Sequence, residues 1–128
     1  MSTTQRKSSL LLLEPDHMLR RTVALTARSA NLAEVREATS IDNARALLKS
    51  DAFDGVLLTL STEDHELELI ENVRAGKTAS SSGATIAVMV TQCDADRAKK
   101  LQLLGVNQII LRPFKVKTLL TTIQAIAA

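Results

Sequence analysis

Short, almost entirely apolar segments are the feature of this sequence that most restricts its fold. Three of them occur, at Ser9–Leu13, Gly55–Leu60 and Thr85–Thr91. Each has the length of a strand and does not alternate between apolar and polar residues, so each predicts a strand that is buried on both faces. Two weaker segments, Asn31–Ala38 and Val106–Leu111, complete a set of five predicted strands.

Segments with helical spacing of apolar residues follow each predicted strand. Asp16, Ser40 and Asp94 precede three of them and are expected to cap helices, while residues 61–64 are expected to cap and begin another. The last helix carries Val116 and the apolar positions after it. Strands and helices that alternate at these lengths predict an α/β fold with a parallel sheet covered on both faces. Right-handed crossovers leave few alternatives to a doubly wound arrangement.

The length of 128 residues suits one compact domain, with residues 1–8 as a loose tail and residues 9–128 as the folded part. The chain has two Phe and no Trp or Tyr, so its core is expected to consist of Leu, Ile, Val and Ala. The scarcity of aromatic side chains excludes base stacking. The net charge of +2, with Arg6 and Lys7 in the tail, is too small and scattered to indicate nucleic-acid binding.

The single cysteine, Cys93, permits no internal disulfide and fits a reducing compartment. The segment Leu10–Leu13 is too short for a membrane span or a signal peptide. We therefore expect a cytoplasmic protein that does not bind a membrane. Cys93 is expected near a helix start; a redox sensor is one interpretation of this position, and a plain small residue is the simpler one.

Doubly wound sheets place their functional sites at the carboxyl ends of the strands. In this sequence those ends carry Glu14, Pro15, Thr59, Thr91, Gln92, Arg112 and Pro113. These residues form the candidate site.

The order of these residues resembles that of response-regulator receiver domains of two-component signalling, the CheY-like family. The resemblance covers almost the whole chain after the tail and implies the five-stranded (βα)5 flavodoxin-like receiver fold. That family has an acidic pair after the first strand, a phosphoacceptor Asp after the third, Ser or Thr after the fourth and Lys-Pro after the fifth. Glu14 matches the first acid, Thr91 matches the hydroxyl position, and Arg112 with Pro113 and Phe114 matches the Lys-Pro-Phe turn.

Three positions depart from the family's pattern. Pro15 stands in place of the second acid, Thr59 in place of the phosphoacceptor, and Gln92 in place of a small residue. Magnesium prefers several oxygen ligands, and only the Glu14 carboxylate remains at these positions. Thr59 has no evident general base beside it. The sequence therefore predicts a degenerate phosphorylation pocket with no metal, no cofactor and no catalytic residue.

The emptied pocket is expected to be occupied by protein side chains. Arg112 matches a carboxylate in two-point geometry, so we expect an ion pair with Glu14 where the family binds metal. Gln92 is expected to fill part of the remaining space. Asp64 is interpreted as a helix-start residue, and His17 as an exposed residue of the first helical turn.

The resemblance also indicates where a partner would bind. The family transmits signals through its fourth helix, fifth strand and fifth helix, with an aromatic switch residue at the position of Ile109. An aliphatic side chain cannot make the usual ring rotation. The last helix has no charge from Thr118 onward, and its apolar positions Leu119, Leu120, Ile123 and Ile126 are expected to face the core. The candidate interface is Ile109, Thr118, Thr121, Thr122 and Ala125, although a Thr-rich solvent face would look the same.

These observations predict a pseudo-receiver that is not an enzyme and binds a protein in one fixed state. The partner is expected to be a histidine kinase or another regulator, or a second copy in a homodimer. One alternative is a receiver that is phosphorylated by an atypical route. Another is a small-ligand sensor with an anionic nucleotide near Arg112, for which no Gly-rich phosphate loop is present. The chain ends with the fifth helix, so no output domain is expected.

Overall fold

The computed structural model describes residues 8–127. Five parallel strands form one sheet in the order β2-β1-β3-β4-β5. The strands are β1 (Ser9–Leu13), β2 (Glu34–Ala38), β3 (Gly55–Thr59), β4 (Thr85–Val90) and β5 (Gln108–Leu111). The helices are α1 (His17–Ser29), α2 (Ile41–Ser50), α3 (Leu67–Arg74), α4 (Ala95–Leu103) and α5 (Val116–Ala127). The predicted doubly wound α/β fold is confirmed.

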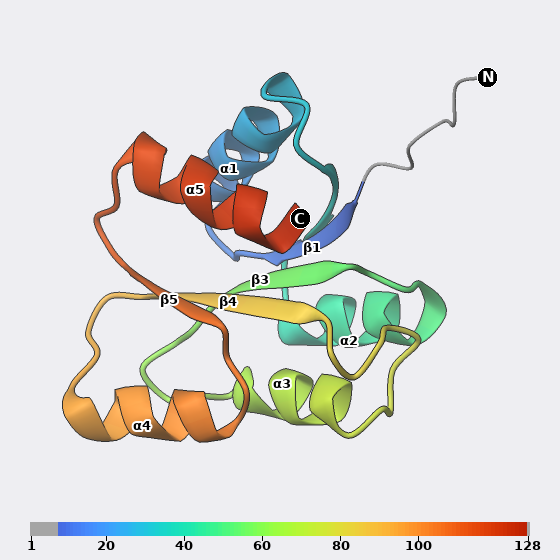
Figure 1. Cartoon of the computed structure of the whole chain (residues 1–128), viewed down its shortest axis with the longest axis vertical. Helices are drawn as coiled ribbons and strands as arrows, with labels where there is room; N and C mark the ends of the chain where they lie inside the picture. The colour runs from blue at the N-terminus through green and yellow to red at the C-terminus, as the bar shows by residue number, and fades with distance from the viewer. Residues whose placement is uncertain (1–7, 128) are drawn as a thin grey trace.

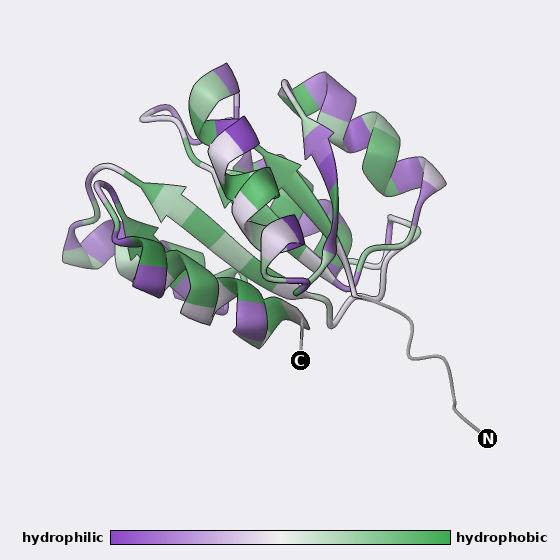
Figure 2. Cartoon of the chain, turned by 90° about the horizontal axis from the view of Figure 1, so that it is seen from above, coloured by the Kyte–Doolittle hydropathy of each residue, from purple (hydrophilic) through white to green (hydrophobic). Residues whose placement is uncertain are grey.

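Helices cover the sheet on both faces, with α1 and α5 on one side and α2, α3 and α4 on the other (Figure 1). This arrangement explains the apolar segments of the sequence. Successive side chains of a strand point to opposite faces. Leu11 and Leu13 belong to the core beneath α2, α3 and α4, while Leu10 and Leu12 belong to the core beneath α1 and α5. Figure 2 shows the hydrophobic strands between helices that are hydrophobic on one side only.

Most element ends follow the local signals in the sequence. Asp16, Ser40 and Asp94 each accept a hydrogen bond from a backbone N–H in the first turn of the following helix, as predicted. The prediction for residues 61–64 was wrong. Helix α3 begins later, after Glu66, and has no side-chain cap. Strand β2 is shorter than predicted because the turn after α1 extends to Asn31, whose φ is 56°.

The tail predicted over residues 1–8, with Arg6 and Lys7, lies outside the described residues except for Ser8. The carbonyl of Ser8 accepts a hydrogen bond of 2.9 Å from the Glu34 N–H. Within residues 8–127, none of the helices has the length and hydropathy needed to cross a membrane.

One arginine joins two loops at the amino end of the sheet. The Arg74 guanidinium donates hydrogen bonds to the backbone carbonyls of Ser82, Ala84 and Gly105. Burial lowers the pKa of Arg74 from its usual value. Gly105 has a φ of 87°, and a Cβ there would lie 2.7 Å from Arg74 Nε. Glycine at this position therefore allows both the left-handed turn after α4 and the close approach of Arg74.

Candidate functional site

The carboxyl end of β1 holds an almost fully buried carboxylate. Glu14 is 2% exposed, and its Oε2 accepts a hydrogen bond of 3.0 Å from the Asp16 N–H. The Arg20 side chain donates from Nη1 to the Glu14 carbonyl over 3.1 Å. Pro15 lies between these groups, is exposed and contributes no side-chain oxygen. Glu14 is therefore fixed in place by its own loop and by the first helix.

Three strand ends meet at the other oxygen of Glu14. Thr59 Oγ1, at the end of β3, donates to Glu14 Oε1 over 2.8 Å. Arg112 Nη2, just after β5, forms an ion pair with the same oxygen and lies 2.8 Å from Thr59 Oγ1. The predicted pair between Glu14 and Arg112 is confirmed. Arg112 Nη2 lies within contact distance of both other groups, so the three side chains form a closed cluster, named here the Glu14–Thr59–Arg112 cluster.

The cluster does not suit a divalent cation. Magnesium requires near-octahedral oxygen ligation, but the guanidinium nitrogen of Arg112 is already in contact with Glu14 Oε1. The other neighbour of that oxygen is a neutral hydroxyl. Over residues 8–127, no group of three or more His, Cys, Asp or Glu side chains is placed to hold a metal ion. A guanidinium thus supplies the positive charge at this carboxylate.

Arg112 also borders a shallow apolar hollow. The hollow has a volume of about 410 Å³ and is lined by Leu19, Thr91, Arg112, Pro113 and Phe114. The peptide bond between Arg112 and Pro113 is cis. Phe114 is partly buried against the core beneath α1 and α5. Thr91 is exposed at the rim.

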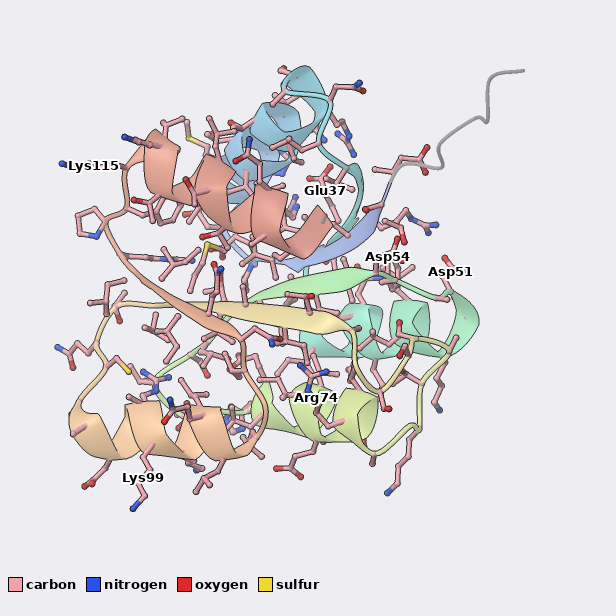
Figure 3. All side chains as sticks on the ribbon, viewed as in Figure 1. Glu37, Asp51, Asp54, Arg74, Lys99 and Lys115 are labelled. Atoms are coloured by element: carbon pink, nitrogen blue, oxygen red, sulfur yellow. The ribbon has the colours of Figure 1, made fainter. Side chains whose placement is uncertain are left out.

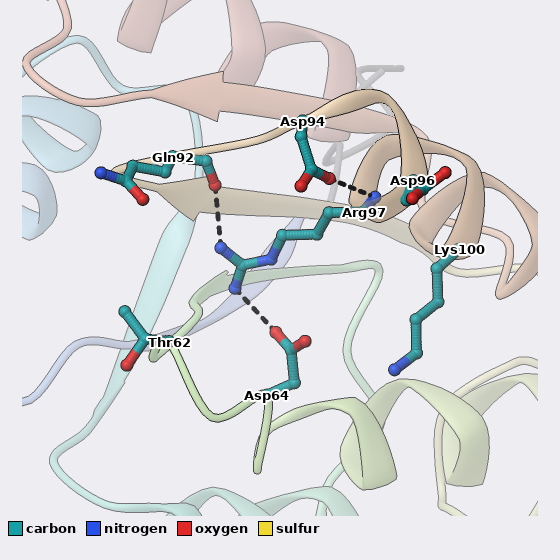
Figure 4. Close-up of a pocket in the computed structure, with 7 residues that line it drawn as sticks. All are labelled: Thr62, Asp64, Gln92, Asp94, Asp96, Arg97 and Lys100. Carbon is teal, nitrogen blue, oxygen red and sulfur yellow. Dashed lines mark hydrogen bonds and ion pairs between the residues drawn. The ribbon is translucent and has the colours of Figure 1, made fainter.

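The expectation that Gln92 fills the emptied pocket was wrong. The Gln92 side chain is exposed, and only the backbone carbonyl of this residue accepts a hydrogen bond, of 2.8 Å, from Arg97 Nη1. Figure 4 shows the Gln92 side chain pointing away from Arg97. Position 92 lies two residues beyond the end of β4, so strand alternation no longer determines its direction.

Arg97 is the main residue that the sequence analysis missed. Its Nη2 pairs with the Asp64 carboxylate over 2.7 Å, while its Nη1 donates to the Gln92 backbone carbonyl (Figure 4). Nη2 also donates to the Ser61 carbonyl over 2.9 Å. One side chain of α4 therefore joins the loop after β3 to the loop after β4. The interpretation of Asp64 as a helix-start residue was wrong, because its carboxylate pairs with Arg97 and its own φ is 57°.

The two arginines share one unusual feature. Within the described part of the chain, the Nε atoms of Arg97 and Arg112 are buried and have no hydrogen-bond partner. Unpaired buried donors are costly. Both side chains hold their positions through Nη atoms alone.

The candidate interface is only partly exposed. Thr118, Thr121 and Ala125 lie on the outside of α5, and Ile109 of β5 is 36% exposed. Thr122 is buried, and its hydroxyl donates to the Thr118 carbonyl over 3.0 Å, so the expectation of an outward Thr122 was wrong. Leu119, Ile123 and Ile126 face the core as expected, while Leu120 is half-buried.

Beta-strand 5 is an edge strand, and it exposes one large residue that the sequence analysis did not include. Leu111 is more exposed than Ile109 and is separated from it by the buried Ile110. Side chains alternate along a strand, so Ile109 and Leu111 point to the same side of the sheet. That alternation was visible in the sequence and could have identified Leu111.

Other candidates have ordinary structural roles. His17 is exposed, and its Nδ1 lies 2.7 Å from Arg20 Nη2. Cys93 is partly buried against the core beneath α2, α3 and α4. These positions contribute to packing and local hydrogen bonds at the edge of the site.

Comparison with known proteins identifies the fold. A CheY-like receiver domain from Methanospirillum hungatei matches with a TM-score of 0.82 and 15% identity, covering 94% of this chain and 93% of that one. The chemotaxis protein CheY4 of Vibrio cholerae matches with a TM-score of 0.82 and 20% identity, covering 94% and 99%. The HemR receiver domain of Leptospira biflexa, in its non-phosphorylated form, matches with a TM-score of 0.81 and 24% identity, covering 95% of each chain.

Comparison of the amino-acid sequence alone gives no such match. No family model matches the chain, and no curated protein matches it either. The structural likeness extends over nearly the full length of each receiver domain. The chain therefore has the receiver fold, with a Glu–Thr–Arg cluster at the carboxyl ends of its strands.

Proposed function

We propose that this chain is a receiver-type domain of two-component signalling that is not phosphorylated on aspartate and acts by binding a protein. The observation that carries the proposal is the Glu14–Thr59–Arg112 cluster, in which Arg112 Nη2 contacts both Glu14 Oε1 and Thr59 Oγ1. The cluster lies where the resemblance to receiver domains implies a metal ion, a nucleophile and a phosphoryl group. Side chains of the protein take up that space.

The chemistry of the cluster is unfavourable for phosphoryl transfer. Thr59 uses its proton in a hydrogen bond to Glu14, and Glu14 is itself paired with Arg112. A hydroxyl nucleophile requires a base that can accept its proton. Glu14 would have to leave its ion pair to serve as that base. Phosphoryl transfer also requires a cation on the phosphate oxygens, and this donor set does not favour magnesium.

The second support is the connection between the two loops beside the cluster. Arg97 links Ser61 and Asp64 to Gln92 through both of its Nη atoms. A ligand shifts a conformational equilibrium only if it binds one state better than the other. With the cluster closed and the loops joined by Arg97, we expect the domain to have one state and its binding to be constitutive.

The proposed binding surface comprises α4, β5 and α5. It exposes Ile109 and Leu111 on the edge strand and the uncharged positions Thr118, Thr121 and Ala125 on α5. A hollow of about 450 Å³ lies between them, lined in part by Ile109, Thr118 and Thr121. Exposed edge strands with apolar side chains favour association. The proposed partner is a second copy of the chain, or a histidine kinase or other regulator.

The test is exposure of the purified protein to acetyl phosphate, or to beryllofluoride, with magnesium. Intact mass is measured after the first treatment, and backbone amide shifts are measured by NMR before and after the second. We expect no mass increase and no shift changes at the strand ends. An intact receiver domain treated in parallel is the positive control. A phosphoryl group that hydroxylamine removes would overturn the proposal.

A further inference from the structure

A small hollow lies between α2, α3 and the loop that follows α3. The two helices pack side by side on the same face of the sheet (Figure 1). The hollow has a volume of about 250 Å³. Its apolar side is formed by Leu48 and Leu69, which are each 1% exposed. Pockets for drug-sized ligands measure about 300–1,000 Å³, so this hollow suits a smaller molecule.

The loop after α3 is held in a fixed position against α2. The Ala79 N–H donates a hydrogen bond of 2.9 Å to the Leu48 carbonyl near the end of α2. Ser80 is buried, and its hydroxyl accepts a hydrogen bond of 2.8 Å from a backbone N–H of the loop after α2. The Lys77 N–H donates to the Asn72 carbonyl over 2.9 Å. The loop side of the hollow is therefore already ordered, which lowers the cost of binding a ligand there.

Two lysines at the hollow carry positive charge that no nearby carboxylate neutralises. Lys49 lies in the last turn of α2 and Lys77 in the loop after α3, and both are exposed. Neither forms an ion pair with another residue in the range 8–127. The arginine at the hollow differs, because Arg45 pairs with Asp42 over 2.6 Å and with Glu68 over 2.9 Å. The free charge therefore comes from two ammonium groups on two separate segments.

Two neutral polar side chains complete the polar side of the hollow. The Asn72 side chain is half-buried and has no hydrogen-bond partner elsewhere in the described part of the chain. Thr78 Oγ1 accepts a hydrogen bond of 3.2 Å from the Ser80 N–H, so its own proton remains free to be donated. An amide and a hydroxyl are thus available to the oxygen atoms of a ligand.

We propose that this hollow binds a small organic phosphate monoester. The phosphate, which carries nearly two negative charges at neutral pH, would lie between the Lys49 and Lys77 ammonium groups. The short apolar part of the ligand would lie against Leu48 and Leu69. Lysine binds phosphate as a point charge, whereas arginine is suited to two-point pairing with a carboxylate, and Arg45 is already paired. The site lies away from the Glu14–Thr59–Arg112 cluster and does not depend on the proposed function.

The size and the charge of this region favour a free small molecule over a macromolecule. A phosphorylated peptide or a phospholipid headgroup presents the same phosphate, but the rest of either molecule would lie outside a hollow of this volume. The three cations of the hollow are matched in number by the exposed carboxylates of Asp42, Glu68 and Glu71 on α2 and α3. The surface around the hollow therefore offers no excess positive charge to an anionic membrane or a nucleic acid.

The test uses the full chain and phenyl phosphate as the probe. Three related compounds separate the parts of the probe: inorganic phosphate lacks the ring, phenol lacks the charge, and benzoate has a carboxylate in place of the phosphate. Binding is measured by titration with NMR detection of backbone amide shifts. We expect shifts centred on Lys49, Asn72 and Lys77, and dissociation constants at least roughly fivefold higher for each related compound. Binding should weaken as the salt concentration rises.

Two variants test the charge and the amide separately. Lys49→Gln with Lys77→Gln should raise the dissociation constant of phenyl phosphate roughly tenfold or more, because both free charges are lost. Asn72→Leu keeps the approximate size of the side chain, removes the amide and should weaken binding several-fold. The matched control is Lys99→Gln with Lys115→Gln, which removes the same charge from exposed positions that Figure 3 shows far from α2. Circular dichroism checks that each variant retains the fold.

The outcomes distinguish the possibilities. Loss of binding in the Lys49/Lys77 variant but not in the Lys99/Lys115 variant supports the site. Equal loss in both variants would show that only net charge matters, and equal affinity for inorganic phosphate and phenyl phosphate would indicate an adventitious ion only. Absence of binding, or shifts that map to the strand ends around Arg112, would overturn the proposal. Tighter binding of a phosphoserine peptide or of phosphatidate vesicles at the same residues would overturn the assignment to a small molecule.

Discussion

The hydroxyl of Thr59 donates a hydrogen bond of 2.8 Å to Oε1 of the buried Glu14. The resemblance to receiver domains implies an aspartate at position 59. Here Thr59 instead donates a hydrogen bond to the carboxylate that follows the neighbouring strand. Strands β1 and β3 are adjacent in the sheet, so the two side chains meet at its edge.

Replacement of Thr59 by Asp is not expected to create a phosphorylation site. The new carboxylate would lie beside Arg112 Nη2 and pair with it. Pro15 would still supply no metal ligand. Intact mass after treatment with acetyl phosphate and magnesium should be unchanged. The triple variant Thr59→Asp, Pro15→Asp, Arg112→Lys restores both acids and the Lys of the resembled family, leaves Gln92 unchanged, and is the informative comparison. Labelling of the single variant would show that Arg112 does not block the site.

Replacement of Arg112 by Gln should destabilise the fold. Glu14 is 2% exposed, and loss of one partner from a buried ion pair costs about 3 kcal/mol. The double variant Glu14→Gln, Arg112→Gln should recover much of this loss because no charge is left unpaired. Urea unfolding measures both values.

The control for this series is Arg36→Gln, which breaks an exposed pair with Asp51. Exposed pairs contribute about 0–1 kcal/mol, so its unfolding midpoint should barely move. If Arg112→Gln behaves like Arg36→Gln, the ion pair in the cluster does not stabilise the domain.

Replacement of Gly55 by Ala should displace the last turn of α5. A Cβ at Gly55 would lie 1.8 Å from Ile126 Cγ2, which is far inside contact distance. Overpacking of this kind typically costs about 1–3 kcal/mol in unfolding free energy. The added variant Ile126→Ala should relieve the clash, so the double variant should cost less than the two single changes together.

Gly83→Ala is the matched control, because a Cβ there would meet only Ser81 Oγ at 3.7 Å. Urea unfolding of the parent and the four variants completes the comparison. Equal behaviour of Gly55→Ala and Gly83→Ala would mean that α5 does not pack on β3 as described.

Charges placed on the α4, β5 and α5 surface should weaken association and leave the fold intact. Ile109→Glu and Thr121→Glu alter exposed positions, and a charge at the centre of an interface has no partner there. Sedimentation velocity gives the oligomeric state, and circular dichroism checks the fold. Ala52→Glu, on the exposed loop after α2, is the control. If both interface variants associate like the parent, the binding surface lies elsewhere.

The layered fold could be predicted because its signals are local. Uninterrupted apolar segments mark strands with two buried faces, and Asp16, Ser40 and Asp94 mark helix starts. The pair between Glu14 and Arg112 could also be predicted, since parallel strands bring their carboxyl ends to one edge of the sheet.

Contacts between distant side chains could not be predicted in the same way. Arg97 and Asp64 are 33 residues apart, and no spacing rule links a helix position to a loop whose path is unknown. Arg20 is a charged residue of α1, yet it is buried because its helix presents it to the Glu14 carbonyl and to Glu37. The burial of Thr122 has another cause. Its hydroxyl donates a hydrogen bond to the Thr118 carbonyl within α5, so the side chain can be buried at little cost.

The Arg112 guanidinium is a counter-ion of Glu14 that is covalently part of the same chain, so it cannot be removed as a bound ion can. A metal ion bound at a carboxylate leaves on dilution or chelation, and its occupancy follows the free ion concentration. Arg112 belongs to the same polypeptide as Glu14. Its local concentration is fixed by the backbone, and every folded copy carries it from the moment of synthesis. The charge of Glu14 is thus neutralised independently of the magnesium concentration, and depletion of divalent ions should leave the Glu14–Thr59–Arg112 cluster unchanged.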